Sequence, residues 1–158
     1  MSLCPDEIAV ALDASDRRDA IARVAALLAE STGRSEAPIF RALWRREQVG
    51  STALGNGIAI PHARIDGIAR PRSLFARTSK PIDFHAPDRR PVFLLYVMLV
   101  PADGATDEHL QRLAMVAQAF SDAALRTDLA ALTEPSEIRR AFSETESRIH
   151  ATQGTRSR

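Results

Sequence analysis

Hydrophobic residues recur every three to four positions in several stretches of the chain, which is the spacing of one face of a helix. This pattern predicts helices over 16–29, 36–48, 107–120, 123–132 and 136–142. Ser15 or Asp16 is available to cap the first helix, and Ser35 to cap the second. Pro38 is compatible with the second helix, because the N–H groups of a first turn have no partner within the helix.

The middle of the chain carries the strand signals. Strands are predicted over 57–60, 73–78 and 92–100, with a turn-rich connection between the last two that has room for a short edge strand around Ile82. The segment 92–100 is apolar throughout, which is typical of a strand covered on both faces. Helices that accompany such a strand place the chain in the α/β class.

Composition sets limits on function. The chain has 158 residues, 45% of them hydrophobic, and a net charge of +1, which describes one globular domain and argues against nucleic acid as the main ligand. The single cysteine, Cys4, can form no internal disulfide, which favours a reducing compartment. The longest apolar run is shorter than the roughly 20 residues of a membrane-spanning helix, and the N-terminus does not resemble a signal peptide. We therefore expect a cytoplasmic protein with no direct membrane insertion.

A glycine-punctuated loop leads to a proline and then a histidine within residues 50–64, Gly-Ser-Thr-Ala-Leu-Gly-Asn-Gly-Ile-Ala-Ile-Pro-His-Ala-Arg. Pro61 fixes its own φ and favours an extended residue before it, so His62 is expected in a stiff frame just past a strand end. Gly55 and Gly57 allow a positive φ or a close approach of the backbone to another group.

The same loop offers a phosphate several backbone N–H groups and the hydroxyls of Ser51 and Thr52. Local chemistry fits two interpretations of His62, a functional imidazole and a plain turn histidine at a strand end.

A second histidine, His109, falls in the first turn of the helix over 107–120, with Thr106 as its expected N-cap. A helix N-terminus favours an anion and disfavours a protonated imidazole, and this helix follows the end of the buried strand, where open α/β sheets usually bind ligands. His109 is therefore a candidate neutral imidazole beside an anion site. The alternative is a partly buried histidine bonded to a backbone carbonyl.

The remaining histidines, His85 and His150, lack such a setting and are expected to be solvated. His62 and His109 could share a metal ion, but no cysteine and no carboxylate at ligand spacing completes a closed site, so no metal is expected. No Walker loop or magnesium-binding carboxylate cluster is present, so direct use of ATP is not expected and no cofactor is implied.

The segment from Arg46 to His62 resembles the active-site signature of the fructose/mannitol-type enzyme IIA domains of the bacterial phosphoenolpyruvate phosphotransferase system. Among these it looks most like the nitrogen-regulatory enzyme IIA. The resemblance continues through Leu-Val-Pro-Ala-Asp at 99–103 and Glu-His-Leu-Gln-Arg-Leu at 108–113, and covers roughly residues 8–145. It implies a single domain over 1–145, with a mixed β-sheet flanked by helices. The polar stretch 146–158 is expected to be a disordered tail.

The sequence departs from the family pattern at two positions. Ala63 stands where the family usually has glycine after the histidine, and Ala53 where glycine often follows the loop threonine. Both changes replace one small residue by another, so they bear on the fine geometry of the loop rather than on phosphorylation.

The resemblance also implies site residues and partners. His62 would accept a phosphoryl group from a histidine phosphocarrier protein (HPr-like), with His109 as the second active-site histidine and Arg46 as the arginine ahead of the loop. Transfer needs positioning and charge stabilisation, which an arginine fork, the His109 N–H and a helix N-terminus can supply. The protein would be a phosphotransferase component, a phosphohistidine carrier rather than a stand-alone turnover enzyme.

Three functions stay open at this point. The favoured one is a phosphoryl-relay protein that regulates partner proteins by its phosphorylation state, because no permease, enzyme IIB segment or DNA-binding helix pair is visible. The same residues would serve an enzyme IIA that feeds a fructose- or mannitol-type sugar permease through an enzyme IIB. A non-catalytic binding module with vestigial histidines is the third, and the intact Arg46, His62 and His109 argue against it.

Overall fold

The computed structural model describes residues 2–157, which form two compact units. One unit comprises residues 6–105 and contains a six-stranded sheet with two helices. The other comprises 2–5 and 106–157 and contains three helices. None of the helices within 2–157 is long and apolar enough to cross a membrane.

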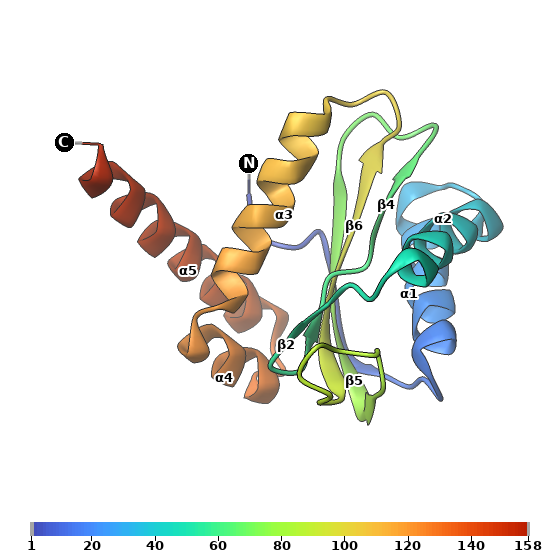
Figure 1. The fold of residues 1–158 in the computed structure, drawn as a ribbon, viewed down its shortest axis with the longest axis horizontal. Helices are drawn as coiled ribbons and strands as arrows, with labels where there is room; N and C mark the ends of the chain where they lie inside the picture. The colour runs from blue at the N-terminus through green and yellow to red at the C-terminus, as the bar shows by residue number, and fades with distance from the viewer. Residues whose placement is uncertain (1, 158) are drawn as a thin grey trace. The chain divides into compact units, whose positions relative to one another are not determined.

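The sheet is mixed and has the strand order β1-β5-β6-β3-β2, with β4 also paired to β6 (Figure 1). Its strands are β1 (Glu7–Leu12), β2 (Ala53–Gly55), β3 (Ile58–Ala59), β4 (His62–Ile65), β5 (Arg72–Ile82) and β6 (Val92–Pro101). Strand β1 runs parallel to β5, β5 antiparallel to β6, β3 and β4 parallel to β6, and β2 antiparallel to β3. The mixed sheet with its helices confirms the predicted α/β class.

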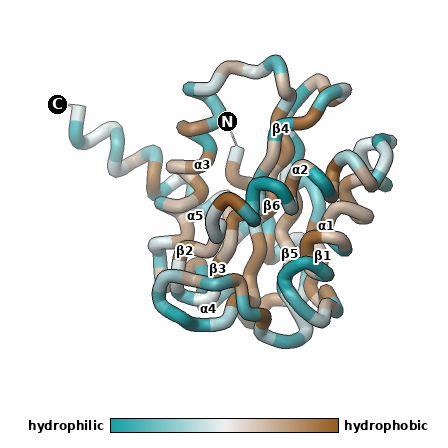
Figure 2. Tube along the Cα trace, turned by 45° about the vertical axis from the view of Figure 1, so that its right-hand side comes forward, coloured by the Kyte–Doolittle hydropathy of each residue, from teal (hydrophilic) through white to brown (hydrophobic). Residues whose placement is uncertain are grey.

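Strand β6 is the buried centre of this sheet, as its unbroken apolar sequence predicts. Leu95, Val97 and Leu99 belong to one hydrophobic core, and Leu94 and Tyr96 on the opposite face are buried as well. Figure 2 shows apolar residues gathered along the central strands. A strand that is buried on both faces of the sheet needs no polar side chains, which is why this segment shows no alternation of polar and apolar residues.

Helices α1 (Arg17–Thr32) and α2 (Glu36–Val49) pack against one face of the sheet (Figure 1). The side chain of Asp16 caps α1 by accepting a hydrogen bond from the Asp19 N–H at 2.8 Å. Ser35 occupies the predicted N-cap position of α2, but its side chain makes no capping bond. The buried side chains of the two helices are Ala20, Ile21, Val24, Ala25, Leu28, Ile39 and Leu43.

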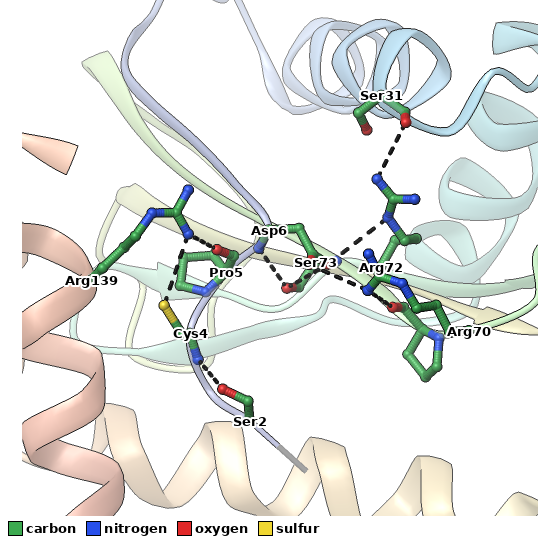
Figure 3. A network of polar contacts seen from close by, with 10 residues as sticks. Ser2, Cys4, Pro5, Asp6, Ser31, Arg70, Arg72, Ser73 and Arg139 are labelled. Carbon is green, nitrogen blue, oxygen red and sulfur yellow. Dashed lines mark hydrogen bonds and ion pairs between the residues drawn. The ribbon is translucent and has the colours of Figure 1, made fainter. Parts of the chain in front are cut away.

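The start of β1 is joined to β5 by a polar network around Asp6 (Figure 3). The Asp6 carboxylate accepts a hydrogen bond from the Ser73 N–H at 2.9 Å, and the Asp6 N–H donates to the Ser73 carbonyl at 3.1 Å. Arg70 and Arg72 pair with the same carboxylate, and Arg72 also donates to the carbonyl of Ser31 at the end of α1. These contacts hold β1 as the edge strand that the sequence analysis did not predict.

Strands β3 and β4 form one interrupted strand along β6. Ile58 is opposite Leu94 and His62 opposite Met98, so the register is unchanged across Pro61. The Pro61 carbonyl accepts a hydrogen bond from the Met98 N–H at 3.0 Å. The missing N–H of Pro61 interrupts the ladder to β6 between Ala59 and His62, and the pairing resumes at His62. His62 therefore begins β4, where the prediction had it just past a strand end.

The second unit contains α3 (Thr106–Phe120), α4 (Ala123–Ala131) and α5 (Pro135–Arg156). The rings of Phe120 and Phe142 pack edge to face, 6.1 Å apart. The guanidinium of Arg139 on α5 donates to the carbonyl of Pro5 and lies against the Cys4 sulfur (Figure 3). The Leu3 N–H donates to the Glu146 carboxylate at 2.8 Å, so residues 3–5 lie along α5.

Helix α5 is much longer than predicted. The prediction ended it at Phe142 and assigned disorder to 146–158, whereas the helix continues to Arg156. The physical reason is that the buried face of the helix continues past Phe142. Its buried residues recur at helical spacing: Ile138, Phe142, Thr145 and Ile149. The polar residues between them concealed this pattern. The domain boundary at residue 145 stays a prediction.

Candidate functional site

The side chains of β4 alternate between the two faces of the sheet, and this alternation sets the direction of His62. Ala63 and Ile65 point into the hydrophobic core shared with α1 and α2, so His62 and Arg64 point to the opposite face of the sheet. His62 and Arg64 are half-buried. The stiff frame that Pro61 was expected to provide is therefore a strand held on both sides of the proline by bonds to β6.

The two ring nitrogens of His62 have different partners. Nδ1 lies 2.8 Å from the carbonyl oxygen of Ile60, and Nε2 lies 3.3 Å from Nε of Arg46. A carbonyl oxygen only accepts and a guanidinium N–H only donates, so Nδ1 carries the proton and Nε2 has the lone pair. The ring nitrogen with an available lone pair is therefore Nε2, a distinction that the sequence left open.

The pKa of His62 is lowered below the ordinary value of 6.5, chiefly because burial penalises the charged imidazolium. The bond to the Ile60 carbonyl acts in the opposite direction and raises the pKa, while the positive charge of Arg46 lowers it further. The net effect keeps His62 neutral at physiological pH, which is the form a nitrogen nucleophile requires.

Arg46 reaches His62 from the last turn of α2. Its Nη1 donates to the carbonyl of Gly50 at 2.8 Å, one of the carbonyls that a helix end leaves without intrahelical partners. This second bond holds the guanidinium plane beside the imidazole. The structure thus brings together two of the predicted site residues, and it does so through the end of a helix and the beginning of a strand.

The hydroxyls of Ser51 and Thr52 hold the loop between α2 and β2. Ser51 Oγ donates to the carbonyl of Phe84 and accepts from the Ala53 N–H at 3.1 Å. Thr52 is buried, and its hydroxyl and N–H both donate to the carboxylate of Glu47. The role of the two hydroxyls as phosphate ligands stays a prediction, and their present bonds are to the protein.

Glu47 is a residue that sequence reasoning missed. It is only 1% exposed, although it follows Arg46 at a helix end where a charged side chain is usually solvated. The available signal was Thr52, a hydroxyl residue placed where the loop turns back on the helix.

Asp88 is a second residue that sequence reasoning missed. Its carboxylate accepts hydrogen bonds from the Asn56 N–H at 2.8 Å and from the Arg90 N–H at 3.0 Å. These bonds and the positive charge of Arg90 lower the pKa of Asp88.

The loop glycines behave as predicted. Gly55 and Gly57 both have positive φ, 92° and 81°. A Cβ on Gly57 would overlap the ring of Phe93, so this position needs both the conformation and the small size of glycine. Its carbonyl accepts bonds from Phe93 and Leu94, which start the pairing of this strand with β6.

His109 lies in the first turn of α3, as predicted, and is half-buried. Val116 and Phe120 further along the same helix face are buried. Because α3 belongs to the unit of residues 2–5 and 106–157, the pairing of His109 with His62 stays a prediction. His85 and His150 are exposed, in agreement with the sequence analysis. Within residues 2–157, no group of three His, Cys, Asp or Glu side chains is placed to hold a metal ion.

Comparison with known proteins gives this geometry a context. The family model described as "Phosphoenolpyruvate-dependent sugar phosphotransferase system, EIIA 2" matches residues 1–145. The nitrogen regulatory protein of Bradyrhizobium diazoefficiens is 37% identical over 136 residues, which are 86% of this chain and 88% of that protein. The crystal structure of nitrogen regulatory protein IIA-Ntr from Neisseria meningitidis has a TM-score of 0.78 and 36% identity, and the match covers 84% of this chain and 92% of that one.

A more distant structure shares the fold. It is the complex of enzyme IIA mannitol with phosphorylated enzyme IIB mannitol from Escherichia coli, at 19% identity and a TM-score of 0.70, over 87% of this chain and 94% of that one. The family model spans most of the chain, and the regulatory relatives match it over most of their own length. The chain therefore belongs to the EIIA type 2 family of the phosphoenolpyruvate-dependent sugar phosphotransferase system.

Proposed function

We propose that this protein accepts a phosphoryl group on Nε2 of His62 from a histidine phosphocarrier, and that it regulates partner proteins according to its phosphorylation state. The observation that carries the proposal is the pair of bonds on the His62 ring. The Ile60 carbonyl holds the proton on Nδ1, and the lone pair of Nε2 faces the guanidinium of Arg46. A neutral nucleophile is thus held next to a cation suited to phosphoryl oxygens.

The proposed transfer balances without a proton donor or acceptor. The lone pair of Nε2 forms a bond to phosphorus as the phosphorus–nitrogen bond of the donor breaks, and that electron pair returns to the donor ring. The proton on Nδ1 stays in place and continues to donate to Ile60. Because the transition state is loose and anionic, most of the catalysis comes from positioning and charge stabilisation.

Arg46 has to change partners during this step. Its Nε–H now occupies the lone pair that would attack, so the contact must open as phosphorus approaches. The bond from Nη1 to Gly50 can stay and keep the guanidinium beside the site while its other donors turn to the phosphoryl oxygens. We assign His109 the role of a second donor to the phosphoryl group, and Ser51 and Thr52 the role of holding the loop.

The relatives favour the regulatory function over the sugar-feeding one. The proteins that match most of this chain at 36–37% identity are nitrogen regulatory proteins. The likeness to the mannitol enzyme, whose structure includes a phosphorylated enzyme IIB, is a likeness of fold. Phosphorylation also suits a switch, because it adds about −1.5 to −2 charges to a chain of net charge +1. The net charge of the chain therefore changes sign on phosphorylation.

The test is an intact-mass measurement on purified protein incubated with phosphoenolpyruvate, enzyme I and a histidine phosphocarrier. We expect the wild type to gain one phosphoryl group that mild acid removes. His62→Ala should gain none, and His85→Ala, which alters an exposed histidine, should behave like the wild type. A normal gain by His62→Ala would refute the site. Rapid sugar-dependent loss of the group to a fructose- or mannitol-type enzyme IIB would favour the sugar branch instead.

A further inference from the structure

Arg64 is a second arginine at the site, and neither the transfer step nor the family resemblance assigns it a role. It is two residues after His62 on β4, so the two side chains stand on the same face of the strand, with Cα atoms about 7 Å apart. Arg64 is half-buried, and its Nη1 donates to the carbonyl of Gly104 at 3.0 Å. A cation is therefore held next to the nucleophile by a neutral acceptor.

Gly104 closes the turn that follows β6. Its N–H donates to the Pro101 carbonyl at 3.0 Å, and the Ala102 N–H donates to the Ile65 carbonyl at 2.9 Å. The bond from Arg64 to Gly104 is thus a second link between this turn and β4, at the same end of the sheet. The turn leads along the chain directly into α3, which begins at Thr106.

We propose that Arg64 reports the phosphorylation state of His62 to this turn, an inference that rests on the proposed function. In the unphosphorylated protein the guanidinium donates to Gly104. When Nε2 carries a phosphoryl group, the guanidinium swings to the phosphoryl oxygens, and the turn over 101–104 loses its link to Arg64.

The exchange is favoured because the new acceptor is charged. Hydrogen bonds to an ionised oxygen are shorter and about twice as strong as those to a neutral carbonyl, and a guanidinium can bind a phosphoryl group through two parallel bonds. The half-buried position of both side chains strengthens this attraction relative to bulk water. Arg46 contributes from the helix side of His62, so Arg64 adds a second cation from the strand itself.

The turn provides the first readout. Hydrogen exchange at the Gly104 N–H should be slow in the unphosphorylated wild type and roughly tenfold faster after phosphorylation. This is the size of change expected when one hydrogen bond to a charged group is lost. In Arg64→Gln the exchange should be fast in both states. Arg70→Gln is the matched control, because it removes an exposed arginine of the same unit that has no bond to the turn, and it should retain the difference.

The phosphoryl group provides the second readout. We expect Arg64→Gln to shift the equilibrium of transfer from a phosphorylated histidine phosphocarrier by about tenfold towards the donor, with Arg64→Lys between it and the wild type. A residue that only anchored the turn would alter exchange in Arg64→Gln and leave this equilibrium unchanged.

The outcomes separate this inference from the function on which it rests. A wild type that gains no phosphoryl mass refutes the proposed function and, with it, the role of Arg64. A wild type that is phosphorylated normally but shows the same Gly104 exchange in both states refutes the role of Arg64 alone. An unchanged transfer equilibrium in Arg64→Gln does the same.

Discussion

At the scale of single residues, the site depends on a histidine that its surroundings keep neutral. Burial of the His62 ring and the charge of Arg46 both lower its pKa, and together they outweigh the opposing bond to Ile60. The same arrangement fixes the tautomer, because only Nδ1 faces a carbonyl. The surroundings of His62 thus fix which ring nitrogen has the lone pair, and they lower the pH at which the ring becomes charged.

This gives a prediction for pH. His62 should titrate below 6.5 in NMR spectra of the folded protein, and phosphoryl acceptance should persist to lower pH than an ordinary histidine allows. Arg46→Met should raise the pKa of His62 only part of the way, because burial, the larger cause, remains. A His62 that titrates at or above the ordinary value would contradict the prediction.

The same shift has a consequence for stability. Because the pKa of His62 is lower in the folded protein than in the unfolded chain, the unfolded chain binds more protons in acid. The contribution of neutral His62 is therefore fully present above about pH 6.5 and is lost as the pH falls through the folded pKa. Urea unfolding of His62→Gln should show a smaller loss of stability between neutral and acid pH than the wild type. Equal losses would contradict it.

At the scale of elements, the loop between α2 and β2 is held by a buried carboxylate. Glu47 accepts both the N–H and the hydroxyl of Thr52, and the loop sets the distance between Arg46 on the helix and His62 on the strand. The relative positions of Arg46 and His62 therefore depend on a bond that neither of them makes.

Replacing this hydroxyl should have a measurable cost. Thr52→Val leaves one bond of a buried carboxylate unmade, and we expect a loss of about 1–3 kcal/mol in the free energy of urea unfolding together with slower phosphoryl acceptance. Thr52→Ser retains the hydroxyl and is the matched control, with a smaller loss from the missing methyl group. If Thr52→Val lost acceptance with its stability unchanged while Thr52→Ser retained acceptance, the hydroxyl would act on the phosphoryl group directly, as first predicted.

Elements were predictable where periodicity or an unbroken apolar run marks them. The two early helices and the central strand lie within a few residues of their predicted bounds, because each buries a continuous apolar stripe or run. Strand β4 was not predicted. Its sequence, His-Ala-Arg-Ile, alternates polar and apolar over only four residues, and it becomes a strand through its pairing with β6.

The site was predictable only in part. The resemblance named Arg46 and His62, and the structure places them in contact although 16 positions separate them. The tautomer, the role of Glu47 and the bond from Arg64 to Gly104 depend on backbone carbonyls and on how a loop returns to its helix. Such contacts leave no periodic pattern in the sequence.

At the scale of the whole molecule, the question is where the folded domain ends. The family model stops at residue 145, and the sequence analysis placed the boundary there. Helix α5 continues to Arg156. Three residues beyond that boundary take part in the fold: Ile149 is buried, Arg148 forms an ion pair with Asp122 at 2.8 Å, and Glu146 accepts a hydrogen bond from the Leu3 N–H. From residue 150 to 157 every side chain is exposed.

Two truncations locate the boundary. Deletion of 151–158 removes the exposed residues 151–157 together with the last residue of the chain, so the free energy of unfolding should change by less than about 0.5 kcal/mol. Deletion of 146–158 removes buried Ile149 as well, and burial of such a side chain contributes about 1.5–3 kcal/mol, so a loss of at least this size is expected. If the two truncated proteins were equally stable, the domain would end at residue 145 and the last turns of α5 would contribute nothing to the fold. If they differ as expected, the structural domain extends beyond the match to the family model, and α5 through Ile149 is part of what holds residues 3–5 in place.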